Sequence, residues 1–344
     1  MLNKGIQYLP AYKMEVNGVD QTGLVRERLI DITVNYSAGG ESDSLDITLD
    51  DSVNARRLHV PLDHKDQVKV WMGFETNLQD MGTFVVNSIT LSGGANAVDT
   101  YSVNAKAIDT AGNIFDRKCK TWSAEQNNAE IPLSVIVNQI ASAHSLECIV
   151  DPSLMNVMTD LEVQWRESDI SFLRKLAEKY SAVVKFYDRK LLFISKNSRS
   201  VTGIPIPPVL LDPQDISDWR VTFGNRWSFN KITAEWWDMD EAKLKQESVT
   251  NSSAKNKKEY ITENIYDSAR EARKAAEAEM QNLLARSNTL TLSILGNPAI
   301  RPFTPILING VRKHVNGLWR AGNVTHTLSS SGYTTRLNEM NEMV

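Results

Sequence analysis

Short runs of alternating apolar and polar residues dominate both ends of this 344-residue chain. Up to about Asp109, Leu45, Ile47 and Leu49 alternate with polar neighbours, and similar runs recur at 30–36, 68–72, 84–91 and 101–107. A period of two with one apolar face is typical of half-buried antiparallel strands. Asn17-Gly18 predicts a tight hairpin, because both central positions of a type I′ turn need positive φ. The pattern predicts a β-barrel or β-sandwich for residues 1–112.

The middle of the chain has a helical period instead. Apolar residues at 133, 136, 137, 140 and 141 share one face of a helix that Pro132 opens. A second helix is predicted over 169–181 with Ser168 as its N-cap, and a hairpin follows around Asp188-Arg189. Two helices beside short strands predict an inserted α+β domain at 113–208, which ends in the proline-containing stretch 195–208.

Strand patterns return near 219–223 and 232–236, and we expect strands within 209–240 to complete the first barrel. The polar stretch 247–258 has almost nothing to bury and is predicted as an exposed loop. A long helix at 268–287 begins at Ser268, with Glu271 in capping-box spacing. The remaining β-rich sequence predicts a second β-barrel over 241–344. The expected fold class is mixed and mainly β: two β-barrel domains, an inserted α+β domain and one long helix.

Composition excludes several classes of function. Hydrophobic residues make up 42% and charged residues 23% of the chain, so wholesale disorder is not expected. The 38 Lys and Arg against 42 Asp and Glu include no basic block, which argues against sequence-specific nucleic-acid recognition. The apolar run 204–211 is short and broken by prolines, so no membrane span is predicted. The N-terminus lacks an export signal, and we expect assembly in a cytoplasm.

Motifs for catalysis or metal binding are absent. The chain contains no P-loop, GxGxxG, HExxH, GxSxG or EF-hand string. Cys119 and Cys148 are far apart, without CxxC spacing, and are expected to be buried or idle thiols. No two histidines lie at i and i+4 on a predicted helix; the histidines are His59, His64, His144, His314 and His326. We therefore predict no enzyme activity, no catalytic residue, no cofactor and no metal site.

One cluster does permit alternatives. Glu235 and Asp238 beside two tryptophans have the residue types of a peptidoglycan-active glycosidase, and Trp236 with Trp237 would suit a glycan-binding tail component. Neighbouring strand residues alternate between faces, however, so opposed catalytic carboxylates at this spacing would be coincidental. We favour one tryptophan in a core and the other at a surface, with Trp236 and Trp237 as candidates for partner binding.

The order of the segments resembles the phage late control D proteins. These are hubs of contractile tails, related to the N-terminal part of the valine-glycine repeat protein G of type VI secretion. The segments that carry the resemblance are AGGESDSLDITLDD (38–51), MGTFVVNSITLSG (81–93), WRESDISFLRKLAEKYSAVVKF (165–186), DSAREARKAAEAEM (267–280) and GLWRAGNVTHTLSSSGYTTRLN (317–338). All five occur in the family's order.

The resemblance implies a structural baseplate hub of a contractile phage tail or phage-derived bacteriocin. Such hubs are homotrimers in which two similar barrels per subunit adapt the sixfold tail tube to the threefold spike. The implied partners are the tail tube protein and the tail spike protein, with tape-measure, wedge or other baseplate proteins as further candidates. The implied location is the tail baseplate of a virion or extracellular particle, assembled in the bacterial host cytoplasm. The family's motifs transfer no catalytic residues.

Overall fold

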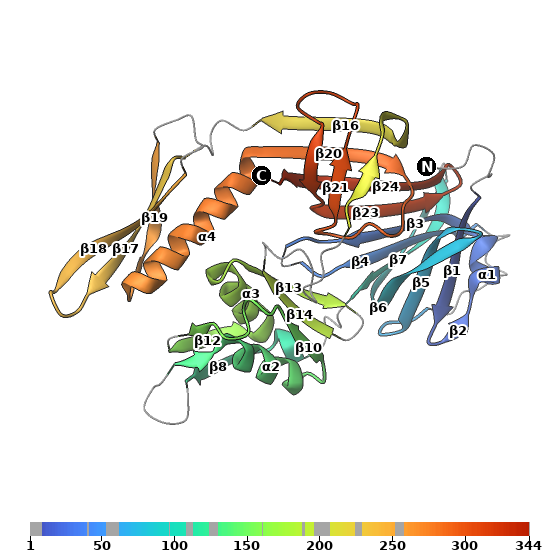
Figure 1. The fold of residues 1–344 in the computed structure, drawn as a ribbon. Helices are drawn as coiled ribbons and strands as arrows, with labels where there is room; N and C mark the ends of the chain where they lie inside the picture. The colour runs from blue at the N-terminus through green and yellow to red at the C-terminus, as the bar shows by residue number, and fades with distance from the viewer. Residues whose placement is uncertain are drawn as a thin grey trace.

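The computed structural model describes residues 9–39, 41–52, 62–95, 97–107, 113–123, 130–159, 161–187, 190–195, 207–223, 229–251 and 258–343. The described residues are mainly β, as expected, with four α-helices among them. Three separate hydrophobic cores organise the fold. Figure 1 shows a large sheet, a small domain packed beneath it, and a helix with a short sheet at one side.

The largest core lies on a fourteen-stranded sheet built from both ends of the chain. Its N-terminal half contains β1 (Pro10–Val16), β2 (Val19–Asp20), β3 (Leu29–Tyr36), β4 (Ser44–Asp50), β5 (Gln67–Phe74), β6 (Asn77–Gly94) and β7 (Ala97–Lys106), with the short helix α1 (Thr22–Arg26). Its C-terminal half contains β15 (Val209–Leu211), β16 (Ile216–Phe223), β20 (Asn288–Leu295), β21 (Pro305–Ile308), β22 (Gly317–Arg320), β23 (Asn323–Ser329) and β24 (Gly332–Glu342).

The local predictions for these strands are confirmed. Leu45, Ile47 and Leu49 are buried while their polar neighbours in β4 stay partly exposed. Asn17 and Gly18 both have positive φ, 49° and 80°, and join β1 to β2. Each alternating run therefore forms a strand with apolar residues toward the core, except that Leu91 and Ile30, at the ends of two runs, are 66% and 38% exposed.

The two halves are joined directly by antiparallel pairing of β3 with β23. Ile32 lies opposite Leu328, and Val34 lies opposite His326, so buried residues continue across the joint. The Thr33 and Thr327 hydroxyls are 3.2 Å apart on the other face. This joint departs from the expectation of two separate barrels: among the described residues the strands form one continuous sheet over a shared core, and no pairing closes either half on itself.

The α+β unit between the halves forms the second core. It contains β8 (Arg117–Trp122), β9 (Ile131–Pro132), α2 (Leu133–Ala143), β10 (Glu147–Val150), β11 (Met158–Thr159), β12 (Glu162–Ser168), α3 (Asp169–Lys179), β13 (Ala182–Tyr187) and β14 (Lys190–Ser195). The Ser168 side chain accepts a hydrogen bond from the Ser171 amide and caps α3, as its position predicts. The predicted hairpin is β13 and β14, which pair antiparallel.

The third core lies between α4 (Ala269–Ser287) and a three-stranded sheet. This sheet has the order β18 (Lys243–Thr250), β17 (Lys231–Asp238), β19 (Glu259–Tyr266). The stretch 247–258 was expected to be a loop, but 247–250 belongs to β18, because alternate residues such as Val249 pack toward α4. Residues 252–257 lie outside the described residues.

Strands within 209–240 pair differently from the expectation. β15 pairs with β21 and β16 pairs with β20, so both join the C-terminal half of the large sheet, while β17 pairs with β18 and β19. Their alternating pattern predicts strands but carries no information on which distant strand becomes the neighbour. No helix among the described residues is both long and apolar enough to span a membrane.

Candidate partner-binding surface

The side chains of Trp236 and Trp237 lie on opposite faces of β17. Trp236 packs with Ile232 and Ala234 against α4, its indole Nε1 buried without a hydrogen-bond partner. The Lys245 ammonium lies over the Trp236 ring, 5.6 Å from its centre. Trp237 points away from α4 and is 43% exposed. The structure thus gives the two tryptophans different surroundings, and of the pair Trp237 is the one available to a partner.

Trp237 belongs to a larger apolar face. Its register partner Leu244, together with Ile261 and Ile265 of β19, is also exposed, and the four side chains are 43% to 60% exposed. We call these four residues the Trp237 face. Large exposed apolar patches on a folded domain mark sites of interaction. Both β18 and β19 are also edge strands of their sheet.

The two candidate carboxylates do not form a catalytic pair. Glu235 lies on the side of Trp237 and accepts a hydrogen bond from Gln246 Nε2 at 2.9 Å. Asp238 pairs with Lys245 at 2.6 Å, and this hydrogen bond lowers the pKa of the Asp238 carboxyl. A glycosidase needs one carboxyl with a raised pKa facing the other across the substrate. The geometry therefore does not favour the glycosidase alternative.

The described histidines have structural surroundings. His144 Nε2 lies 2.6 Å from Asp169, His314 packs edge-on to Phe223, and His64 is exposed at a turn. His59 lies outside the described residues. In the part of the chain that the structure describes, no three His, Cys, Asp or Glu side chains form a group suited to a metal ion. Cys148 is half-buried, and burial raises the pKa of its thiol to about 11; Cys119 is exposed, and both thiols are free.

His326 is fully buried beside the joint between the sheet halves. Its Nε2 lies 3.1 Å from the Ile300 carbonyl, which can only accept, so Nε2 carries the proton. Its Nδ1 then accepts, and the Tyr333 hydroxyl lies 2.9 Å away. Burial, helped by the positive charge of Arg301, lowers the pKa of His326 to about 3. His326 is a neutral core residue with its ring nitrogens satisfied.

Strand β12 and Leu161 just before it present a second apolar row, which the sequence patterns above do not predict. Leu161, Val163 and Trp165 point outward and are 42% to 66% exposed, whereas Glu162 and Gln164 between them are buried. We call these three residues the Trp165 row. The alternation of apolar and polar residues in 161–165 predicts a strand with one apolar face. The usual rule turns that apolar face toward the core. Here the polar face is buried and the apolar face is exposed.

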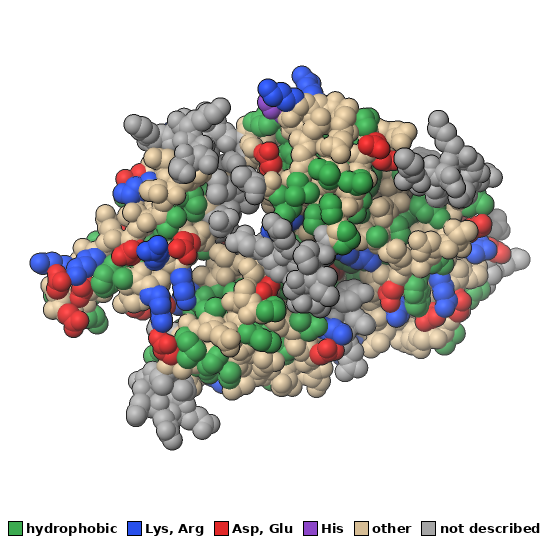
Figure 2. Space-filling model, viewed as in Figure 1, with side chains coloured by type: hydrophobic (Ala, Val, Ile, Leu, Met, Phe, Trp, Pro, Cys, Tyr) green, Lys and Arg blue, Asp and Glu red, His purple; other side chains and the backbone are tan. Residues whose placement is uncertain are grey.

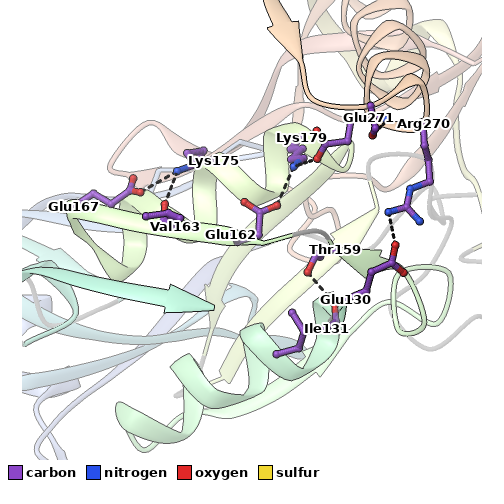
Figure 3. A network of polar contacts seen from close by, with 11 residues as sticks. Glu130, Ile131, Thr159, Glu162, Val163, Glu167, Lys175, Lys179, Arg270 and Glu271 are labelled. Carbon is purple, nitrogen blue, oxygen red and sulfur yellow. Dashed lines mark hydrogen bonds and ion pairs between the residues drawn. The ribbon is translucent and has the colours of Figure 1, made fainter. Parts of the chain in front are cut away.

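A polar network joins the α+β unit to α4. Lys179, at the end of α3, binds Glu162 at 2.9 Å and also pairs with Glu271 in the first turn of α4, as Figure 3 shows. Arg270 pairs with Glu130 at 2.8 Å in the same contact. Beside it lies a cavity of about 360 Å³ whose lining includes Tyr180 and Lys274. The contact is polar, and Lys179 is 29% exposed, whereas the Glu162 and Glu271 side chains are 7% and 10% exposed.

Comparison with known proteins identifies the family. A model of the phage tail baseplate hub (GPD) family matches residues 132–332, which is more than half of the chain. The chain belongs to the phage tail baseplate hub (GPD) family. The probable baseplate hub proteins of Escherichia phages 186 and P2 are each 26% identical to it, over 98% and 97% of this chain and 94% and 93% of theirs. A phage tail baseplate hub is thus the function that these similarities support.

Solved structures share the fold at lower identity. The 43 kDa tail protein of prophage MuSo2 from Shewanella oneidensis superposes with a TM-score of 0.71 at 14% identity, covering 96% of this chain and all of the other. A tail protein from Neisseria meningitidis MC58 gives a TM-score of 0.71 at 13% identity, with 97% of each chain covered. The E. coli c3393 protein, a type VI secretion component, gives 0.59 at 10% identity, over 96% of this chain and 77% of that one.

Proposed function

We propose that this baseplate hub protein forms a homotrimeric ring that adapts the sixfold tube of a contractile phage tail, or of a phage-derived bacteriocin, to a threefold spike. It acts by structure, without catalytic residues or cofactor. Its partners are the tail tube and tail spike proteins, with tape-measure, wedge or other baseplate proteins around them. It is assembled in the bacterial host cytoplasm.

The observation that carries this proposal is the joint of β3 with β23. It fixes two β-halves of one chain side by side in a single sheet over a shared core. In this proposal each half of the sheet acts as one β-module toward the tube, and the α+β unit at 113–208 is a separate domain between them. Three subunits with two such modules present six surfaces, which lets a closed threefold ring meet sixfold tube rings.

Light scattering on the purified protein tests the ring. We expect a mass about three times the subunit mass of 38.6 kDa. We also expect co-purification with the tail tube and tail spike proteins of the same particle. A chain that stays monomeric at all concentrations and binds neither protein would contradict the proposal.

Zymography on peptidoglycan tests the enzymatic alternative. We expect no clearing by the wild-type protein, because Glu235 and Asp238 lie on opposite faces of β17. Clearing that disappears in a Glu235→Gln variant would instead establish a glycosidase.

A further inference from the structure

Strand β12 is inverted relative to an ordinary surface strand, and its buried polar residues are fully engaged. Gln164 accepts from the Trp122 indole at 3.3 Å and donates to the Asp169 carboxylate at 2.9 Å, while Glu162 binds Lys179. These contacts fix the strand so that Leu161, Val163 and Trp165 must point outward. A monomer gains nothing from that orientation, because exposed apolar side chains stay hydrated. The Trp165 row therefore points to a partner.

The Trp165 row carries positive charge. A bulge between Gln164 and Glu167 puts Arg166 at a φ of 50° and holds its guanidinium 5.4 Å from the centre of the Trp165 ring. Arg117, opposite Ser168 on β8, is also exposed. Among the described residues neither arginine has an ion-pair partner. The row combines apolar area with cations that are free to pair across an interface.

The Trp237 face carries exposed carboxylates, among charged side chains of both signs. Glu235 lies on it, two residues from Trp237, with its carboxylate held by the neutral Gln246 amide and no ion-pair partner among the described residues. Glu263 of β19 is exposed as well. Figure 2 shows charged side chains of both signs gathered over the β17–β19 sheet at the left of the molecule.

We propose that the Trp165 row of one subunit packs against the Trp237 face of the next copy of this chain, with Arg166 facing Glu235. This contact rests on the proposed homotrimer. A threefold ring requires a heterologous interface, in which each subunit uses two different patches, one toward each neighbour. The chain offers two apolar patches centred on a tryptophan, on different domains, one with Arg166 and the other with Glu235 beside it, which is the arrangement that such an interface needs.

Two serine variants test the contact. Trp165→Ser and Trp237→Ser are each expected to weaken trimer formation about 100-fold in sedimentation, because central tryptophans dominate interface energies. Leu91→Ser is the matched control: Leu91 is an exposed apolar residue, 66% accessible, on β6 outside both patches, and its variant should remain trimeric. All three side chains are exposed, so circular dichroism and thermal unfolding of the monomers should match the wild type.

Mixing the two tryptophan variants gives a sharper result. Trp165→Ser keeps an intact Trp237 face and Trp237→Ser keeps an intact Trp165 row, so one good contact can form between them. We expect a 1:1 complex that does not close into a ring. An Arg166→Glu variant should weaken the trimer about tenfold or more, and Arg166→Glu with Glu235→Arg should restore it.

The outcomes separate this inference from the proposed function. If wild type and both tryptophan variants are equally trimeric, the inference is wrong and the ring stands. If the variants stay trimeric but lose binding to the tail tube or spike protein, that protein occupies the patch and the inference is again overturned. If the wild type is only monomeric, the ring and this contact both fail.

Discussion

Two lysines six positions apart in the α+β unit make opposite kinds of contact. Lys185 of β13 reaches Asp43, which immediately precedes β4 of the large sheet, at 3.2 Å, and the two side chains are only 11% and 4% exposed. Lys179 reaches Glu162 and Glu271 and is 29% exposed. Burial lowers the pKa of Lys185 despite Asp43, whereas two carboxylates outweigh burial and raise the pKa of Lys179. The number of neighbouring carboxylates and the access of water therefore decide whether the pKa of a buried lysine is lowered or raised.

The α+β unit is thus attached to the large sheet and to α4 by two different kinds of ion pair. Toward the sheet the contact is dry, and Asp43 is fixed further by the Ser37 amide at 2.9 Å. Toward α4 the contact is wetter, because Lys179 is 29% exposed against 11% for Lys185, and salt can screen its ion pairs. We expect the dry contact to be rigid and costly to disrupt, and the wet contact to open at little cost.

Replacing Lys185 should give the largest effect. Lys185→Met leaves Asp43 buried without its cation, and we expect the free energy of unfolding to fall by about 3–5 kcal/mol. Urea denaturation at fixed protein concentration measures it. Lys190→Met is the control, because Lys190 pairs with exposed Glu147; its loss should be about 1 kcal/mol or less. The double variant Lys185→Met/Asp43→Asn should recover part of the lost unfolding free energy. Equal losses in Lys185→Met and Lys190→Met would refute the dry contact.

Acid should weaken the buried joint at His326 by an intermediate amount. The pKa of His326 is near 3 in the fold and 6.5 in the unfolded chain, so as pH falls below 6.5 only the unfolded chain gains the proton. The unfolding free energy should therefore be about 2 kcal/mol lower at pH 5 than at pH 7 from this residue.

Denaturation at the two pH values checks this in wild type and in His326→Gln, which should lose that part of the pH dependence. His64→Gln, at an exposed turn, should keep it. The NMR signal of the His326 ring offers a second measurement and should not move between pH 7 and pH 5. A signal that titrates near 6.5 would show that the ring is hydrated.

Removing Lys179 should give the smallest loss. Lys179→Met should lower the free energy of unfolding by about 1–2 kcal/mol. The loss is small because water can solvate the Glu162 and Glu271 carboxylates when the contact opens. The difference from wild type should shrink between 0.05 and 0.5 M salt, whereas the Lys185 difference should not. Unfolding at the two salt concentrations measures both. A loss that is independent of salt would mean that the Lys179 contact is as dry as the other.

Local structure followed from local sequence. The apolar spacing of Leu133, Ile136 and Ile140 predicts α2, and Ser168 and Ser268 mark the starts of α3 and α4, because periodicity and capping involve residues within a few positions. The same rule placed Trp236 and Trp237 on opposite faces of one strand.

Long-range pairing could not be predicted this way. The joining of β3 to β23 and the transfer of β16 to the C-terminal half depend on which strands meet in space. The sequence does not predict strand β18, because its half-buried positions include the charged residues Lys245 and Glu247 beside the apolar Val249. The Trp165 row was missed because its buried partners, Glu162 and Gln164, are polar.

The pairing of β3 with β23 also depends on the order of synthesis. Thr33 of β3 cannot contact Thr327 of β23 until the ribosome has added a further 294 residues. At ribosomal speeds of about 5–20 residues per second, that is roughly 15–60 s during which the β3 edge is bare. An uncovered strand edge is a template for aggregation. Until β23 emerges, the β3 edge of a nascent hub is therefore open to pairing with the wrong strand.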